Sequence, residues 1–284
     1  MKKGILSLIA ATLPLAGQWL DYKDPRIPRE KDGRPNLTAP APRLNGKPDL
    51  SGVWQAERTP VSELTRVLGK EAATVQVDLT DVTKYMINVF WDTQPGQEPL
   101  LPAAAAVTKQ RGGMDFVTAR CWPGGVPASQ LIEPFKIIQT AREIALISGI
   151  GDPTRQIYLD GRGLPQDPEP TWMGYSVGTW RGDELVVETT GITEKSWLDA
   201  FGHPRSPSMH IRETYRRRDF GHMELGITFE DPKYYTRPFS IKTELVLLPD
   251  MDVLEYVCTD NEKDFSHAGP ASAAPSPSSV PVQH

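Results

Sequence analysis

The stretch His210-Ile211-Arg212-Glu213 is the most polar part of a segment that otherwise has the composition of a β-strand. Side chains alternate between the two faces of a strand, so His210 and Arg212 share one face and Glu213 shares the other with Tyr215. If the first face is interior, an imidazole enters the protein near Arg212. If the second is interior, a carboxylate enters beside Tyr215, where burial raises its pKa. Either group suits general acid–base catalysis, and the structural alternative is an inner ion pair with a solvated outer set.

A second polar pair, Asp160 and Arg162, follows the strand-like run 156–159 in a glycine-bounded turn. A functional interpretation places the pair at the mouth of a barrel, with Arg162 holding an anionic group of a ligand. The structural alternative is a turn in which Asp160 binds its own backbone and Arg162 is exposed.

Aromatic side chains are numerous among the expected strands, and they predict either a core or a ligand cavity. In a barrel of eight or nine strands the two coincide, because such a barrel is just wide enough to hold one small molecule. The candidate catalytic residues are His210, Glu213 and Asp160. The candidate binding residues are Arg162, Arg212, Tyr158, Tyr175, Tyr215 and Trp180.

Other patterns with chemical meaning are weak. Residues 174–178 match Gly-x-Ser-x-Gly, but a tight turn into another strand follows, whereas the serine-hydrolase elbow requires a helix. His203, His210 and His222 show no metal-ligand spacing. The sequence has no phosphate-binding glycine loop and no dinucleotide fingerprint, so we expect neither a metal nor a cofactor.

The elements that must position these residues are short strands. In the segment 173–190, two runs rich in Val, Thr, Tyr and Trp flank Gly182 and Asp183, which predicts a hairpin with Arg181 facing Glu184 and Trp180 facing Leu185. Similar runs are expected at 135–140, 143–148, 155–160, 174–180, 184–189, 210–217, 223–229, 240–248 and 253–258. So many strands with hairpin-length links predict a mainly β protein, an antiparallel, lipocalin-like up-and-down barrel.

Helical spacing interrupts the strand pattern between about residues 61 and 110. Val61, Leu64, Val67 and Leu68 form one helix-spaced set, and Val82, Tyr85, Met86 and Val89 form another, with Asp78 or Thr80 as its cap. We therefore expect a few short helices in the N-terminal third.

Gly52-Val53-Trp54 is similar to the opening of lipocalin-like barrels, in which the tryptophan closes one end of the barrel. More broadly, the chain resembles an uncharacterised family of exported bacterial proteins with the phrases GKPDLSGVW, YLDGR, GDELVVET and a His-x-x-Glu strand. These phrases lie here at 46–54, 158–162, 182–189 and 210–213. The resemblance covers residues 19 to about 261 and implies export, but no activity.

Composition and the chain ends set the remaining expectations. Residues 1–17 carry two lysines and an apolar run too short to span a membrane, which indicates an export signal, although a short buried helix is the alternative. Residues 18–50 are expected to form a Pro-rich arm, residues 51–266 one barrel domain, and residues 267–284 a disordered tail. A net charge of −5 argues against nucleic acid as a partner.

Cys121 and Cys258 are the only cysteines, and export would allow them to form a disulfide. Together these features predict an exported barrel, without stable membrane insertion, that binds a small hydrophobic or aromatic molecule. The alternative is a cofactor-independent lyase, isomerase or hydratase acting on such a molecule inside the barrel. A third interpretation is an envelope interaction protein with a filled interior.

Overall fold

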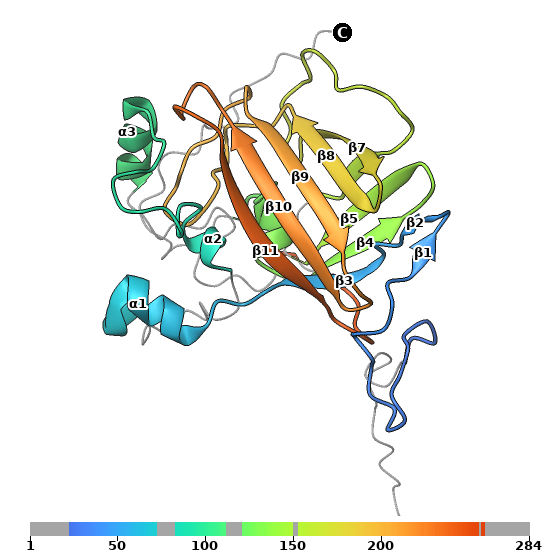
Figure 1. Ribbon diagram of the computed structural model, residues 1–284. Helices are drawn as coiled ribbons and strands as arrows, with labels where there is room; N and C mark the ends of the chain where they lie inside the picture. The colour runs from blue at the N-terminus through green and yellow to red at the C-terminus, as the bar shows by residue number, and fades with distance from the viewer. Residues whose placement is uncertain (1–22, 73–82, 112–120, 150–152, 256, 259–284) are drawn as a thin grey trace, which may run out of the picture.

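The computed structural model describes residues 23–72, 83–111, 121–149, 153–255 and 257–258. Within these ranges nine strands close into one barrel, in the order β10, β11, β3, β4, β5, β6, β7, β8 and β9 (Figure 1). The barrel strands are β3 (Gly52–Ala56), β4 (Phe135–Gln139), β5 (Glu143–Ser148), β6 (Arg155–Tyr158), β7 (Tyr175–Arg181), β8 (Glu184–Thr190), β9 (His210–Arg217), β10 (His222–Glu230) and β11 (Phe239–Leu247). The predicted mainly β barrel is confirmed, and the architecture is compatible with a lipocalin-like one.

Besides the barrel strands, the same ranges contain a short ladder and four helices: β1 (Arg43–Leu44), β2 (Lys47–Pro48), α1 (Val61–Ala72), α2 (Lys84–Ile87), α3 (Pro102–Arg111) and α4 (Ala128–Leu131). The N-terminal cap of α2 is Thr83, whose hydroxyl accepts a hydrogen bond from the backbone N–H of Tyr85. The cap predicted at Asp78 or Thr80 falls outside the described residues. The helix α4 was not predicted.

The hairpin of β7 and β8 has the predicted register. Arg181 pairs with Glu184 and Trp180 with Leu185, and Gly182 has a φ of 62°. A glycine reaches this left-handed conformation without the steric penalty of a Cβ. Local turn chemistry was sufficient to predict this hairpin.

The pairing of β6 with β7 differs from the prediction, because these two strands run parallel. Only Ile157 with Ser176 and Tyr158 with Val177 are in register there. The chain between them, residues 159–174, returns from the end of β6 to the end where β6 began, and a connection of this length allows a parallel pair. The barrel is antiparallel at its other eight junctions, as the sequence predicts for most of the sheet, and this seam is the one parallel exception among the described strands.

The predicted strand at 253–258 is also wrong for its described residues, which have no regular structure. Pro249 and Asp250, which has a φ of 59°, turn the chain away after β11. The free edge of β11 is paired instead with β3, with Leu247 opposite Trp54. The barrel strand that comes first in the chain, β3, thus closes the barrel, and no edge is left for another strand.

Trp54 of β3 is fully buried and packs against Arg217 at the end of β9. The indole N–H of Trp54 donates to the carbonyl of Leu50 at 2.9 Å, and the guanidinium carbon of Arg217 lies 4.9 Å from the centre of an indole ring. Arg217 also donates to the carbonyls of Asp49 and Phe220. That Trp54 closes one end of the barrel stays a prediction.

The described part of the N-terminal arm lies against the barrel. The backbone N–H groups of Phe220 and Gly221 donate to the carbonyls of Ala39 and Leu37, each at 2.7 Å. Arg43 forms an ion pair of 2.8 Å with Asp183 in the β7–β8 turn. The predicted export signal and C-terminal tail lie outside the described residues.

Cys121 and Cys258 form the predicted disulfide, with their Cα atoms 5.4 Å apart. It ties the segment that leads into α4 to the segment that follows β11. The helices in the described ranges are all too short or too polar to cross a lipid bilayer.

Candidate functional site

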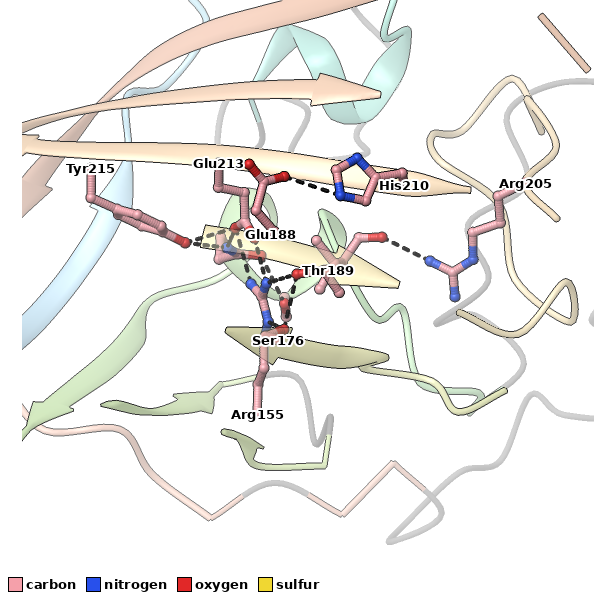
Figure 2. Close-up of polar contacts among 11 residues, drawn as sticks. Arg155, Ser176, Glu188, Thr189, Arg205, His210, Glu213 and Tyr215 are labelled. Atoms are coloured by element: carbon pink, nitrogen blue, oxygen red, sulfur yellow. Dashed lines mark hydrogen bonds and ion pairs between the residues drawn. The ribbon is translucent and has the colours of Figure 1, made fainter. Parts of the chain in front are cut away.

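The barrel interior contains a group of hydrogen-bonded polar side chains, here called the interior polar cluster (Figure 2). Four adjacent strands and α4 supply its members, which are Gln130, Arg155, Ser176, Thr189, Glu213 and Tyr215. In β9 the buried residues are Ile211, Glu213, Tyr215 and Arg217, whereas His210 and Arg212 are partly exposed. The interior face of β9 is therefore the one that carries Glu213.

The carboxylate of Glu213 accepts four hydrogen bonds. Arg155 donates Nη1 to Oε1 at 3.0 Å and Nη2 to Oε2. The hydroxyl of Tyr215 donates to Oε1 at 2.8 Å, and the amide nitrogen of Gln130 donates to the same oxygen at 2.6 Å. Two parallel N–H groups on one carboxylate form the bidentate arrangement that makes arginine pairs strong and specific in direction.

The guanidinium of Arg155 is satisfied on its other sides by two hydroxyl groups. Its Nε donates to Ser176 Oγ at 3.1 Å, and its Nη2 donates to Thr189 Oγ1 at 2.8 Å. These two hydroxyl oxygens lie 2.9 Å apart and share a hydrogen bond. All three guanidinium nitrogens therefore have partners, as a charge held in an apolar barrel requires.

The prediction that burial raises the pKa of Glu213 is wrong. Burial does oppose ionisation, but the charge and hydrogen bonds of Arg155 outweigh it and hold the pKa of Glu213 below its usual 4.5. Burial and the adjacent carboxylate raise the pKa of Tyr215 well above 10. At neutral pH the cluster consequently contains a carboxylate, a guanidinium and a neutral phenol donor.

The cluster is closed to solvent. The side chains of Arg155 and Glu213 are both 0% exposed, so no space the size of a water molecule touches either. A general acid or base must come within hydrogen-bond distance of its substrate, directly or through one water. In this conformation Arg155 and Glu213 form a structural ion pair, which is one of the alternatives that the sequence left open.

His210 and Arg212 lie on the outer face of β9. His210 Nε2 is 3.1 Å from Glu188 Oε2 (Figure 2). Arg212 Nε is 3.6 Å from Glu188 Oε1. The side chains of His210 and Arg212 are 40% and 42% exposed. Ion pairs at this exposure contribute little to stability, and His210 lies on the opposite face of β9 from Glu213.

Four predicted residues gather at the seam between β6 and β7. The rings of Tyr158 and Tyr175 are 5.4 Å apart, and the guanidinium carbon of Arg162 lies 3.8 Å from the centre of the Tyr158 ring. Arg162 Nη1 donates to the Tyr175 hydroxyl at 3.3 Å. Asp160 accepts Arg162 Nε at 2.9 Å and Nη2 at 2.6 Å. The structural alternative for the turn fits, because Asp160 accepts the backbone N–H of Arg162 at 3.3 Å and Arg162 is 43% exposed. Whether Arg162 holds an anionic group of a ligand stays a prediction.

The hydrogen bonds from Arg162 lower the pKa of Asp160 to about 2, and they raise the pKa of Arg162. Asp160 is therefore a carboxylate throughout the physiological range. It positions Arg162 rather than exchanging a proton with a substrate.

A groove of about 230 Å³, here called the seam groove, lies beside these residues. It is lined by Gln156, Tyr158, Trp172, Met173, Tyr175 and others of segments 153–158 and 171–176. The crossing loop is fixed above it, because Thr171 donates its N–H to the carbonyl of Gly191 and accepts from Thr193, each at 2.9 Å. Gly174 permits the close passage of the loop, since a Cβ at this residue would lie 2.8 Å from the carbonyl oxygen of Thr190.

The candidate catalytic residues do not come together. Glu213 is sealed inside the barrel, His210 is outside its wall, and Asp160 is at the seam. Trp180 lies near the β7–β8 turn, where it is partly buried against the core. Among the described residues, no group of three or more His, Cys, Asp or Glu side chains is arranged to hold a metal ion.

Sequence reasoning missed Arg155, Gln130 and Trp172. Arg155 lies on the inward face of β6 together with Ile157. This position identifies Arg155 as an interior residue only once it is known which face of the strand points inward. The Gly-x-Ser-x-Gly serine, Ser176, is buried in β7 and bonded to Arg155, as a strand residue rather than an exposed nucleophile.

Comparison with protein-family models, with curated proteins and with solved structures finds no match to this chain. Its class accordingly follows from the fold and from the two sites just described. It is a closed β-barrel with a sealed polar cluster inside and an aromatic groove on its outer wall.

Proposed function

We propose that this protein is an exported β-barrel that binds a small hydrophobic or aromatic molecule, and that the ligand lies in the seam groove. One observation carries this proposal. Tyr158, Tyr175 and Trp172 converge on one groove beside an exposed guanidinium, whereas the polar cluster inside the barrel is closed. Binding pockets are typically concave and apolar, with a few polar groups that fix the orientation of the ligand.

The chemistry of the groove favours a planar aromatic ligand with an acidic or hydrogen-bonding substituent. Aromatic side chains attract other rings in offset or edge-to-face arrangements. Arg162 lies at the edge of the groove, where its N–H groups can also reach an oxygen of the ligand. The volume of about 230 Å³ lies below the roughly 300 Å³ at which pockets for drug-sized ligands begin, which limits the ligand to one or two rings.

Two features support export. The disulfide between Cys121 and Cys258 is of a kind that persists in oxidising compartments. The first residues have the charge and apolar run of a secretory signal. Mass spectrometry of the protein from an exporting host should therefore show a mature chain that begins near Gly17, whereas recovery of an intact Met1 terminus would contradict export.

The alternative of a lyase, isomerase or hydratase has less support. Such catalysis needs titratable groups from different strands around a shared space. Glu213 is instead bonded on all sides away from solvent, and His210 and Asp160 lie elsewhere. The proposal is consequently one of binding.

The proposal is tested by titrating the protein with indole, phenolic acids and monoterpenes while following tryptophan fluorescence and heat. We expect saturable binding of at least one aromatic compound, weakened at least tenfold by Tyr175→Ala and by Trp172→Ala. Tyr234→Ala is the matched control, because Tyr234 is partly buried outside the groove. Equal loss in the control, or saturable binding that both groove variants retain, would refute the location.

A further inference from the structure

A second and larger groove, here called the arm groove, lies where the N-terminal arm meets the barrel. Its volume is about 440 Å³, which falls within the range of small-molecule pockets. The arm, strands β3 and β4, and the segment after β11 all contribute to its walls. Its apolar lining is mostly aliphatic and includes Ile27, Val53, Ile138, Leu247, Leu248 and Met251.

Two of these aliphatic side chains are unusually exposed. Ile138 is 43% exposed and Met251 is 57% exposed, whereas Val53 in the wall is buried. Apolar surface left in water on both sides of a concave site is surface that an apolar ligand would cover. The groove therefore offers the same kind of contact on its wall and at its rim.

The charged side chains around the rim already have partners. The ion pairs are Asp24 with Arg26 at 2.6 Å, Asp250 with Arg29 at 2.6 Å, and Asp252 with Lys136 at 2.8 Å. A charged ligand would have to compete with these pairs. A neutral one leaves them intact, so the rim favours an uncharged occupant.

Arg217 also lines the groove, and it too is engaged. Its side chain donates to backbone carbonyls, and its guanidinium carbon lies 4.9 Å from the centre of a Trp54 ring. The carboxylates of Asp49 and Asp219 raise the pKa of Arg217 and so oppose the lowering caused by burial. Burial lowers the pKa of Arg217 to about 10, so the group remains charged at neutral pH. Its charge is balanced locally rather than directed at a ligand.

We propose that the arm groove binds the alkyl chain of an uncharged amphiphile. The flexible aliphatic lining matches a hydrocarbon chain, as the rigid aromatic lining of the seam groove matches a ring. Because the charged side chains around the groove are already in ion pairs, a neutral polar head group can remain in solvent without displacing them. This site is separate from the seam groove and does not depend on the function proposed for it.

The test is a series of n-alkyl glucosides with chains of six to ten carbons, each below its micelle concentration, followed by calorimetry on the full chain. Each added methylene should tighten binding by about fourfold until the groove is filled, after which the affinity should level off. Methyl glucoside, which has the head group without the chain, should not bind.

Two groove variants and two control variants locate the site. Ile138→Asp should weaken binding of the longest chain at least tenfold, and Met251→Asp, in an exposed loop, should do the same if the first variant folds poorly. The matched control is Leu254→Asp, since Leu254 is 75% exposed but outside the groove. Leu254→Asp and the seam variant Tyr175→Ala should both bind as the parent does.

The proposal is overturned by an affinity that does not change with chain length, by equal losses in Leu254→Asp and Ile138→Asp, or by no binding at all. Binding of decyl sulfate with no binding of decyl glucoside would also overturn it, because that result would assign the groove to an anion through Arg217.

Discussion

Replacing Glu213 by glutamine keeps the shape of the side chain but removes the charge that Arg155 faces. The guanidinium stays in place, 0% exposed, with its strongest partner neutral. The opposite change, Arg155→Met, leaves the carboxylate of Glu213 with only Tyr215 and Gln130 as donors. Each single change therefore leaves one buried charge uncompensated.

The size of the effect follows from the contacts. Glu213 accepts two hydrogen bonds from Arg155 and one each from Tyr215 and Gln130, and bonds to charged groups contribute roughly 1.5 to 3 kcal/mol each without being additive. Measured losses on breaking a buried ion pair are about 3–5 kcal/mol. We expect each single variant to lose about that much free energy of unfolding.

The double variant Arg155→Met/Glu213→Leu separates charge from packing. It removes both charges and fills the space with apolar side chains. The cost is one partner fewer for the hydroxyl groups of Ser176 and Thr189, and the loss of the shared acceptor of Tyr215 and Gln130. It should be more stable than the sum of the single losses predicts, with a coupling energy of at least about 2 kcal/mol.

The assay is guanidinium chloride unfolding of the oxidised protein at pH 7, with all four members of the cycle measured under the same conditions. A loss below about 1 kcal/mol in Glu213→Gln, or a coupling energy within error of zero, would refute the reasoning. Either result would mean that water reaches the pair and that the interior is open.

Three further predictions concern stability. The pKa of Glu213 is lower in the folded chain than in the unfolded chain, so the unfolded chain binds more protons in acid. The stability that Glu213 contributes should therefore be complete above a pH of about 4.5 and should fall as the pH drops below that value. The double variant should lose less stability over the same drop in pH. Gly174 has a φ of 65°, and Gly174→Ala places a Cβ against the carbonyl oxygen of Thr190, so the variant should lose at least about 1 kcal/mol of free energy of unfolding. An unchanged midpoint of chemical unfolding would contradict the close approach. Replacing both Cys121 and Cys258 by serine opens a loop with a sequence separation of 137 and should lower the free energy of unfolding by roughly 4–5 kcal/mol. Chemical unfolding of the parent and the variant without reductant measures this loss. A loss under about 1 kcal/mol would contradict the prediction.

Local signals in the sequence were sufficient where neighbours in space are also neighbours in the chain. The β7–β8 register follows from Gly182 and the residues on either side of it. The pair of Arg155 and Glu213 is 58 residues apart in sequence, and its existence depends on which face of each strand points inward. Alternation cannot decide that face, because a shift of one residue exchanges the two sets.

The partner of Glu213 also explains why its pKa was predicted in the wrong direction. Burial was inferred correctly for one of the two alternatives, but the compensating cation comes from β6, and the sequence gives no pairing between β6 and β9. The helix α4 was missed for a different reason, since Ala128–Leu131 is a single turn, too short to show a helical period.

The directions of the strands around the barrel determine which connection between strands can change in length and composition. If every strand ran opposite to both neighbours, the directions would alternate around the ring, and a ring can alternate without a break only when its number of members is even. With nine strands described, at least one adjacent pair must share a direction, and the pair of β6 and β7 is that break. The odd number of strands thus requires one parallel pair, and the long connection between β6 and β7, which lies over the seam groove, joins that pair. The length and composition of this connection can change without altering the antiparallel pairing at the other eight junctions.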